Sequence, residues 1–479
     1  ISHTSDVLVS WDPSLYTSST DTSVIYTVQI SKDSTFQSEP LFEFTTDTTG
    51  FRLTDEKIEV RQKYFARVRA NNLGDRPSSQ WVVSHGFQIQ GIQIMLTRKT
   101  KVQSTKVQLH WIPQSDISQL VLVADSIHGF DTTRINITSS EVSSGIIEVD
   151  NLSPNTIFHV ELYTDQKSVG YANFKTKPAI NGHIVDLSSI TGRPEILSDT
   201  LSNIPAGSVV LLKRGANYAF NSGYSFEKSV TIMSKPGFTE RAHIDMDGSS
   251  LNVEEDLTLD SIVFKDLTIS GEYGSSYLLN VSRTCEVAKI EFNNCKLNNM
   301  RGVFRIKSSN VIQVNNINYF NCVIDSINGY GVMNINNSAA QVNNIRLRNT
   351  TISNAQIIIA GEANVDSVLF GHCTFYNAPA RSGKFTVDFG HDNKAAYVGF
   401  TSCLFGKTEG TKGARIGDGA QLYVSNSYKT NDYESTSKDI TGLILFDQPS
   451  NKVFKDPKNR DFTIIDSNFP AVGDPRWLP

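Results

Sequence analysis

Cysteine, methionine and long apolar runs are scarce in this sequence, and each scarcity narrows the possible folds. Five of the 479 residues are Cys and five are Met, and no two Cys have the CxxC spacing of a zinc site or redox motif. No run of about 18 apolar residues occurs, so we expect no segment that spans a membrane. No stretch keeps the 3.6-residue apolar period of a helix. The formal net charge of −5 gives no reason to expect a nucleic-acid partner.

The rest of the composition is ordinary for a globular protein. Apolar residues make up 39% and charged residues 19% of the chain, as in soluble globular proteins. A length of 479 residues predicts about three domains. The sequence begins at Ile1 without a Met or an export signal, so we expect a mature or trimmed chain whose signal and any anchor lie outside it.

A short motif recurs between residues 257 and 422. Its anchor positions, 267, 295, 322, 350, 373 and 403, lie 28, 27, 28, 23 and 30 residues apart. A nearly fixed period with variable insertions is typical of a solenoid, because each repeat buries its apolar face only against its neighbours. Apolar and polar residues alternate within each repeat, and Asn and Gly separate the runs. We expect three strands per repeat, which form one coil of a parallel β-helix with coils about 4.8 Å apart.

Four of the five cysteines share one register of this repeat. Cys295, Cys322, Cys373 and Cys403 are four of the six anchor positions. We interpret them as small apolar side chains stacked inside the coil. Cys285 lies off this register, and we expect a lone thiol there.

Two modules precede the solenoid. Val7–Trp11 and Val107–Trp111 each end an alternating strand with a Trp, and the two Trp residues are 100 positions apart. A late strand with an adjoining turn or loop is expected at Tyr64–Ala70 in the first module and at Leu152–Leu162 in the other. These segments resemble fibronectin type III domains, which are β-sandwiches of about 90 residues.

We therefore expect fibronectin type III-like domains at residues 1–90 and 91–178 and a β-helix domain at 179–479. The Trp residues of the two modules could be exposed platforms for sugars, but that position favours a core role. The modules then serve for spacing and display.

The start of the third domain predicts a cap. The segment Ser189–Leu201 holds the only plausible helix before the coils, with Pro194 near its start and Pro205 just beyond its end. A helix there would cover the open first coil, whose strand edges would otherwise stay unpaired. The following residues, Ala206–Tyr218, resemble the first strand and turn of a right-handed, pectate-lyase-like β-helix, so the whole chain is predicted to be all-β.

The C-terminal residues carry another resemblance. Phe454–Pro457, Arg460–Ile464 and Gly473–Trp477 are similar to the closing segment of surface β-helix lipoproteins of Bacteroidetes. In that family fibronectin-like modules precede a pectate-lyase-like helix, and many members belong to pectin-utilisation systems. The resemblance implies a lipid-anchored monomer on the extracellular face of the outer membrane, with outer-membrane glycan-uptake components as possible partners.

A polysaccharide lyase would need Ca²⁺ ligands and a base. Calcium requires several oxygen ligands from adjacent coils, and the base, an Arg or Lys, must reach the proton that it removes. The nearest candidates are Asp388 and Asp392 for the metal and Lys384, Arg415 or Arg305 for the base. No register of the repeat stacks carboxylates, so we expect no resident cofactor. Bound Ca²⁺ is the alternative.

A hydrolase of the polygalacturonase type is less compatible with the sequence. It requires paired carboxylates as acid and base, and no Asp-Asp pair precedes Gly371–Cys373 or Gly390–Asp392. His372 lies beside the Cys register, where a packed or corner histidine is the usual role.

Polar residues recur on one predicted outward face of the coils. If Phe304 and Ile306 point inward, Arg305 and Lys307 point outward. Asn334 and Asn336 take the same places on the next coil, and Asp388 and Arg415 on later ones, while Arg381, Lys384 and Tyr330 lie in loops. Such a track suits an acidic sugar chain, because Arg pairs bidentately with carboxylates and Asn bonds hydroxyl groups.

Three hypotheses stand. The first is a non-catalytic cell-surface protein that binds an acidic, pectic polysaccharide through this track. The second is a pectate-type lyase that uses the candidates named above, with Ca²⁺. The third is a structural or adhesive surface protein without a glycan ligand. The missing carboxylate register favours the first.

Overall fold

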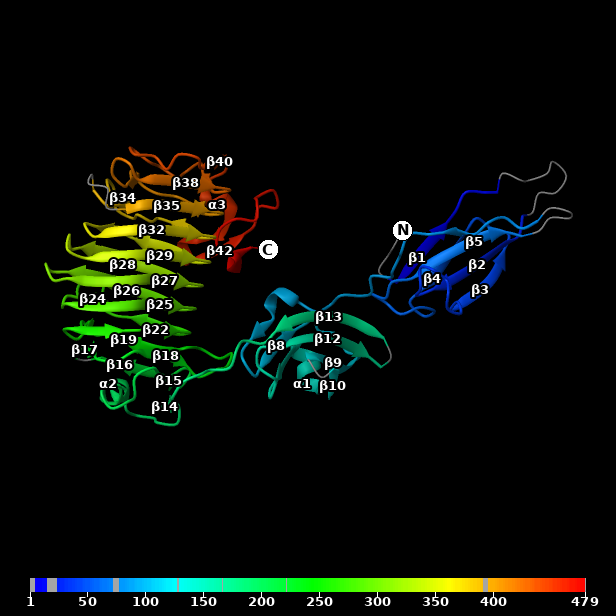
Figure 1. The fold of residues 1–479 in the computed structure, drawn as a ribbon, viewed down its shortest axis with the longest axis horizontal. Helices are drawn as coiled ribbons and strands as arrows, with labels where there is room; N and C mark the ends of the chain where they lie inside the picture. Colours follow the sequence, from blue (N-terminus) through cyan, green and yellow to red (C-terminus); the bar gives the residue numbers. More distant parts are fainter. Residues whose placement is uncertain are drawn as a thin grey trace. The chain divides into compact units, whose positions relative to one another are not determined.

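The computed structural model describes residues 5–14, 24–71, 77–126, 129–165, 167–220, 222–390 and 395–478. The protein is all-β and forms two compact units, Ile1–Ala179 and Ile180–Pro479. Two β-sandwiches make up the first unit and a parallel β-helix the second (Figure 1). Within the described residues, no helix is long and apolar enough to cross a bilayer.

The first sandwich packs a two-stranded sheet on a four-stranded one. Its core includes Val7, Val28 and Tyr64, and Trp11 is half-buried with its ring 5.5 Å from that of Tyr26. The antiparallel strands of the small sheet are β1 (Asp6–Ser10) and β4 (Gly50–Thr54). In spatial order, the large sheet has β3 (Phe42–Thr46), β2 (Tyr26–Ser31), β5 (Phe65–Ala70) and β6 (Val82–Val83).

The second sandwich repeats this arrangement with one more strand. Trp111 is 2% exposed and lies in its core, as predicted. The small sheet has β11 (Ile146–Val149), β8 (Val107–His110) and β7 (Lys101–Val102), after the 3-10 helix η1 (Thr97–Lys99). The large sheet has β10 (Gly129–Asn136), β9 (Ile117–Ser126), β12 (Ile157–Thr164) and β13 (Ser168–Lys175). The shared strand order makes both modules fibronectin type III-like.

One helix in the second sandwich was not predicted. The α1 helix (Ser139–Ser144) begins with a capping box between Thr138 and Glu141 and ends at Gly145, whose φ is 66°. The expectation that the only helix before the coils lies within Ser189–Leu201 is therefore wrong. So short a helix cannot show an apolar period, and the capping box was its only sequence signal.

The second unit is a right-handed parallel β-helix with three faces. Face 1 consists of β14 (Ile184–Asp186), β15 (Ser208–Leu212), β18 (Val230–Ser234), β22 (Ile262–Lys265), β25 (Cys285–Asn293), β27 (Ile312–Phe320), β29 (Gln341–Arg348), β32 (Asn364–Gly371), β35 (Ala395–Thr401) and β38 (Gln421–Ser425), with β21 (Leu257–Leu259) beside β25. These parallel strands are stacked one above another in Figure 1.

Faces 2 and 3 share two long strands, β26 (Lys296–Lys307) and β28 (Val323–Asn336), which bend from one face to the other. Face 2 also has β16 (Asn217–Ala219), β19 (Ala242–Asp245), β23 (Leu267–Ser270), β30 (Thr351–Ala355), β33 (Thr374–Tyr376), β36 (Leu404–Phe405), β39 (Tyr428–Thr430) and β40 (Ile444–Phe446). Face 3 also has β17 (Tyr224–Phe226), β20 (Leu251–Val253), β24 (Tyr277–Val281), β31 (Ile359–Gly361), β34 (Phe385–Asp388) and β37 (Lys412–Arg415).

A left-handed residue turns the chain from face 1 to face 2 in each coil from β22 onward. Asp266, Asn294, Asn321 and Asn349 hold this place with φ between 51° and 56°, a conformation that Asn and Asp tolerate better than most residues. Their side chains also bond along the stack, since Asn294 Nδ2 donates to Asp266 Oδ1 at 2.9 Å. His372 occupies the same corner, with φ 50°. The recurring Asn of the sequence motif is thus a corner residue.

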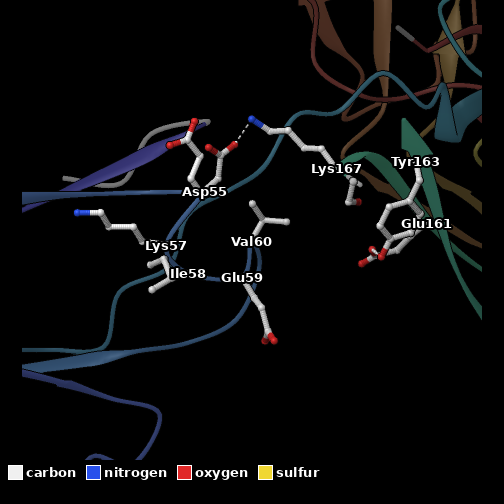
Figure 2. A pocket seen from close by; sticks show the side chains of 10 residues that line it. Asp55, Lys57, Ile58, Glu59, Val60, Glu161, Tyr163 and Lys167 are labelled. Carbon is white, nitrogen blue, oxygen red and sulfur yellow. Dashed lines mark hydrogen bonds and ion pairs between the residues drawn. The ribbon is translucent and has the colours of Figure 1, made fainter. Parts of the chain in front are cut away.

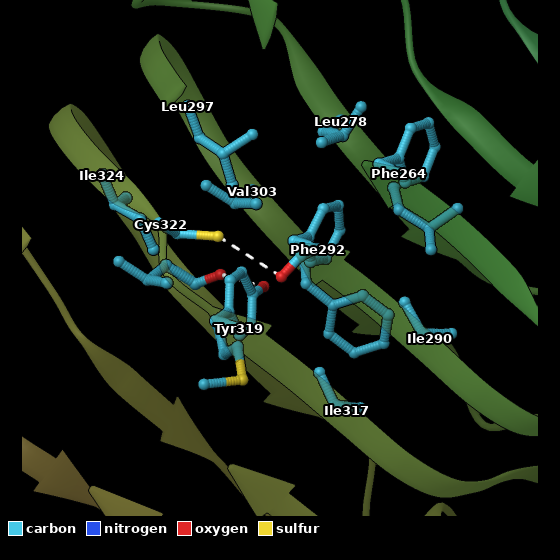
Figure 3. Packing of buried hydrophobic residues seen from close by; sticks show 14 of the residues in the cluster. Phe264, Leu278, Ile290, Phe292, Leu297, Val303, Ile317, Tyr319, Cys322 and Ile324 are labelled. Carbon is cyan, nitrogen blue, oxygen red and sulfur yellow. Dashed lines mark hydrogen bonds between the residues drawn. The ribbon is translucent and has the colours of Figure 1, made fainter. Parts of the chain in front are cut away.

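The next residue of each coil points into the interior, and here the predicted cysteine stack is confirmed. Cys295, Cys322, Cys373 and Cys403 are at most 1% exposed, and each thiol donates to a carbonyl of the preceding coil, as Cys322 does to Phe292 O at 3.3 Å. Figure 3 shows this contact beside the stacked rings of Phe264, Phe292 and Tyr319. Cys285 is also buried, and burial raises the pKa of its thiol to about 11.

The first coil and one face of the second unit are covered. The cap is the α2 helix (Ile196–Leu201), which buries Ile196, Leu197 and Leu201 and is shorter than the predicted segment. The C-terminal tail packs on face 2, where Trp477 Nε1 donates to Thr351 Oγ1 at 2.7 Å. The tail consists of α3 (Ser450–Val453), β41 (Phe454–Asp456), η2 (Pro457–Asn459), β42 (Asp461–Ile464) and η3 (Pro475–Trp477). Faces 1 and 3 are therefore the faces to consider for a ligand.

Candidate functional site

One outward register of face 3 carries four of the predicted site residues. Strand pairing places Arg305 opposite Asn334, and Asp388 opposite Arg415, with Ala360 between the two pairs. Asn280 precedes them on the coil below. Lys307 and Asn336 are paired in the next outward register, and both are exposed. We call the first register the face 3 column; it consists of Asn280, Arg305, Asn334, Ala360, Asp388 and Arg415.

Arg305 is not exposed, contrary to its predicted place on an open strand surface. Its residue exposure is 9% because the rings of Tyr277 and Tyr330 cover it, with the guanidinium carbon 5.2 Å and 4.4 Å from their centres. Nη1 donates to Tyr277 Oη at 3.2 Å. The buried Nε has no hydrogen-bond partner among the described residues, and neither does the buried Oδ1 of Asn280.

Two residues of this cluster, Arg301 and Tyr277, were not predicted from the sequence. The Arg301 guanidinium lies 4.3 Å from the centre of the Tyr330 ring, and the Tyr277 and Tyr330 rings are 5.4 Å apart and inclined by 71°. The pairing of β26 with β28 shifts between Met300 and Gly302, which turns Arg301 toward Tyr330. We call Tyr277, Arg301, Arg305 and Tyr330 the Arg–Tyr cluster.

The Arg–Tyr cluster carries two positive charges that are not balanced locally. Neither guanidinium forms an ion pair with a carboxylate in the part of the chain that the structure describes. Several other arginines of the second unit do form ion pairs, such as Arg214 and Arg241 with Asp266. Burial raises the pKa of Tyr277, so its hydroxyl stays protonated at neutral pH. The cluster is thus a cationic, aromatic surface in which Arg305 Nε still lacks a hydrogen-bond acceptor among the described residues.

The other end of the column is electrically neutral. Arg415 binds Asp388 through two hydrogen bonds, Nε to Oδ1 at 2.7 Å and Nη2 to Oδ2 at 2.8 Å, and its guanidinium lies 4.6 Å from the centre of the Phe385 ring. Both groups were candidates for lyase chemistry. Because both oxygens of the Asp388 carboxylate accept hydrogen bonds from Arg415, each of these two groups is already engaged by the other.

The remaining predicted residues lie near this end. Arg381 is exposed and Lys384 is half-buried, both in the loop that precedes β34. Asp392 falls outside the described residues. Among those that are described, no three His, Cys, Asp or Glu side chains group as metal ligands.

The first unit contains a polar cavity of about 530 Å³ beside Asp55 and Glu161 (Figure 2). Its charges are largely paired: Lys167 Nζ lies 2.5 Å from Asp55 Oδ2, and Arg61 Nη2 donates to Glu161 Oε1 at 2.9 Å. Burial, together with a hydrogen bond to Glu161, raises the pKa of Tyr163 to about 12. The two ion pairs beside this cavity connect the first sandwich to the second. Such contacts are in keeping with a spacer role for the two modules.

Comparisons with known proteins give partial matches. A domain of unknown function (DUF4957) matches residues 216–355, and another (DUF5123) matches residues 368–477. The curated proteins contain no match.

Solved structures similar to the chain include two sets of chicken domains. The FN1–FN3 domains of chicken CNTN1 are 16% identical with a TM-score of 0.16, and the match covers 37% of this chain and 62% of that one. A two-domain fibronectin type III segment of chicken tenascin is 11% identical with a TM-score of 0.18, covering 37% and 94%. The fibronectin type III-like assignment therefore rests on the strand order of the sandwiches.

Proposed function

We propose that this chain is a non-catalytic, cell-surface carbohydrate-binding protein that captures an acidic plant cell-wall polysaccharide of the pectic, uronate-containing type. The coarser class, a surface or adhesive protein, is supported by the two fibronectin type III-like modules and the β-helix. The Arg–Tyr cluster on face 3 is the observation that favours an acidic ligand. The proposal includes a lipid anchor outside this sequence, on the extracellular face of the outer membrane, and monomeric action beside glycan-uptake components.

The charge of the cluster supports an anionic ligand. A buried guanidinium without a counterion is costly, and an ion that pairs with it offsets this cost. A uronate carboxylate fits because it accepts two parallel hydrogen bonds from one guanidinium. Arg301 is half-buried and reaches solvent, so it can make the first contact, while the unpartnered Nε of Arg305 lies beneath.

Neighbouring groups suit the remainder of a sugar chain. The rings of Tyr277 and Tyr330 offer apolar surface with a polar edge. Asn334 lies in the same register as Arg305, and Lys307 and Asn336 lie in the next outward one. Successive coils repeat along the axis of the β-helix, so a chain lying along face 3 meets Arg305 and Asn334 on neighbouring coils, before Ala360 interrupts the column.

β-elimination is less well supported than binding. A lyase needs a base that can accept a proton and ligands that hold Ca²⁺. Asp388 and Arg415 occupy each other through two hydrogen bonds. This leaves Lys384 and Arg305 as the described candidate bases, and neither forms an ion pair with a described carboxylate that could also bind calcium.

Binding to polygalacturonate in affinity gels and by calorimetry, with ultraviolet monitoring of unsaturated products, tests the proposal. We expect wild-type binding without product formation. Arg301→Ala should weaken binding about tenfold, the loss of one charge-assisted contact. Arg305→Lys, which keeps the charge but loses the planar fork, should weaken it similarly.

The control is Lys296→Ala, which removes an exposed cation from the same strand but on face 2. Equal losses in the control and in Arg301→Ala would mean general charge attraction. Wild-type protein that binds no acidic polysaccharide, or growing product absorbance, would refute the proposal.

A further inference from the structure

Face 1 carries another surface, with a different chemistry. We infer that Leu369, Tyr397 and Tyr423 form a platform for a neutral glycan chain, separate from the Arg–Tyr cluster. These residues come from the adjacent strands β32, β35 and β38, which lie side by side in Figure 1. The inference shares with the proposed function only the carbohydrate class of the ligand.

The platform is open and apolar. Leu369 is 36% exposed and Tyr423 50% exposed, and strand pairing aligns both with Gly399, which lies between them. A Cβ atom on Gly399 would lie 3.1 Å from Tyr397 Cε1 and 3.2 Å from Leu369 Cδ2. The Tyr397 ring therefore leans over the bare backbone of Gly399 and fills the gap between its neighbours. The result is a continuous surface across three coils.

A row of hydrogen-bonding groups continues the same registers on the preceding coils. Asn316, Asn344 and Ser367 align with Tyr397. Ser367 Oγ donates to Asn344 Oδ1 at 2.8 Å, and Arg346 Nη1 donates to Asn316 Oδ1 at 2.9 Å. These bonds fix the side chains in place, so a ligand need not order them on binding.

One group of this row is left without a partner. Asn318 aligns with Arg346 and, through it, with Leu369. It is 6% exposed, and its buried Oδ1 accepts no hydrogen bond within the described residues. Buried acceptors of this kind are normally satisfied. A donor arriving from outside, such as a sugar hydroxyl, would satisfy it.

Tyrosine rings next to a row of amide groups suit a polymer of pyranose sugars. The apolar C–H face of a pyranose packs on a tyrosine ring, whose hydroxyl stays in water, and its hydroxyl edge bonds to amides. Arg346 is already bonded to Asn316, and Glu291 lies beside Asn318. The three platform side chains, Leu369, Tyr397 and Tyr423, are uncharged, so a neutral chain suits this surface better than an acidic one. The two registers run along the helix axis, as an extended polymer requires.

Affinity electrophoresis against a panel of neutral polysaccharides (galactan, arabinan, xyloglucan and glucomannan) tests this inference on the full chain. Wild-type protein should bind at least one of them. Tyr423→Ala should weaken that binding about tenfold, and Tyr397→Ala should act in the same direction. Tyr423→Phe, the matched control, keeps the ring and should retain most of the affinity.

Each variant is also tested on polygalacturonate, which separates this inference from the proposed function. Loss on the neutral polymer with unchanged polygalacturonate binding supports a separate surface. Wild-type protein that binds none of the panel, or Tyr423→Ala that binds as wild type, overturns it. A concentration-dependent dimer in sedimentation that Tyr423→Ala abolishes would also overturn it, since the platform would then be a contact between copies.

Discussion

Replacing Asp325 with Ala should loosen the C-terminal tail from face 2. Asp325 is 4% exposed and accepts hydrogen bonds from Ser353 Oγ at 2.6 Å, Ser326 Oγ at 2.7 Å and Asn354 Nδ2 at 2.8 Å. It also pairs with Arg460 of the tail, whose Nε lies 2.6 Å from Oδ2. One carboxylate thus joins three residues of the coils to a residue more than a hundred positions later in the chain.

The cost can be divided among these partners. Ser353 is fully buried, so its hydroxyl would be left without an acceptor at a cost of about 1–3 kcal/mol. Ser326 and Asn354 are half-buried and can bond to water instead. The Arg460 side chain is 52% exposed, so its ion pair contributes only about 0–1 kcal/mol. We expect Asp325→Ala to cost roughly 1–4 kcal/mol and Arg460→Ala at most about 1 kcal/mol.

Hydrogen exchange measured by mass spectrometry on peptides from residues 454–478 reports how often the tail opens. Asp325→Ala should raise exchange there well above that of Arg460→Ala, and strands near α2 should change little because solenoid coils contact only their neighbours. Asp418→Ala, an exposed carboxylate in a later loop, is the control. If Arg460→Ala raised exchange as much as Asp325→Ala, the assignment of most of the cost to Ser353 would be wrong, because the ion pair would then account for the whole effect.

The same carboxylate gives the tail a pH dependence. Burial alone would raise the pKa of Asp325, but hydrogen bonds from Ser353, Asn354, Ser326 and Arg460 outweigh it and hold the pKa below its ordinary value. A carboxyl group whose pKa is lower in the folded state stabilises that state above its unfolded pKa of about 3.9. This stabilisation is lost as the pH falls through the folded pKa, so protection of the tail should decline in acid, and Asp325→Asn should reduce the decline.

Two further predictions concern other buried groups. Burial raises the pKa of Asp474, so its contribution has the opposite sign: it favours folding below the unfolded pKa and is lost as the pH rises through the folded pKa. Asp474→Asn should therefore stabilise the tail above that range in thermal melts, and an unchanged pH profile would contradict this. Cys403→Ser should change the free energy of unfolding by at most about 1 kcal/mol, because Ser427 holds the equivalent place one coil later and donates to Phe400 O at 3.3 Å. Cys403→Leu should cost about 1–3 kcal/mol by overfilling the coil, and denaturant midpoints distinguish the two.

The regular parts of this protein follow directly from its sequence. Residues that repeat every 23 to 30 positions must stack in parallel coils, so the interior place of the cysteines and the corner place of Asn could be predicted without coordinates. The alternation around Trp111 predicted a sandwich core for the same reason. In each case the pattern is visible in the local sequence, and the burial of alternate side chains follows from strand geometry.

The candidate site could be predicted only in outline. Alternation along β26 correctly gave Arg305 an outward direction, and the period placed Asn334, Asp388 and Arg415 in one register. Alternation says nothing about what covers an outward side chain, so the burial of Arg305 beneath Tyr330 was missed. Arg301 was missed because a register shift in the strand pairing, which no local pattern records, turns it toward the same ring.

What the sequence determined by itself was the architecture: two sandwiches, a period, an interior and a line of polar residues along one face. Tertiary structure alone decided which of these residues remain available to a ligand. It paired Asp388 with Arg415 and brought Arg460 to Asp325, contacts between residues 27 and 135 positions apart. It left Arg301 and Arg305 without a carboxylate partner among the described residues, because ion pairing depends on distances across coils and loops, whereas alternation and period describe only the order of residues along the chain.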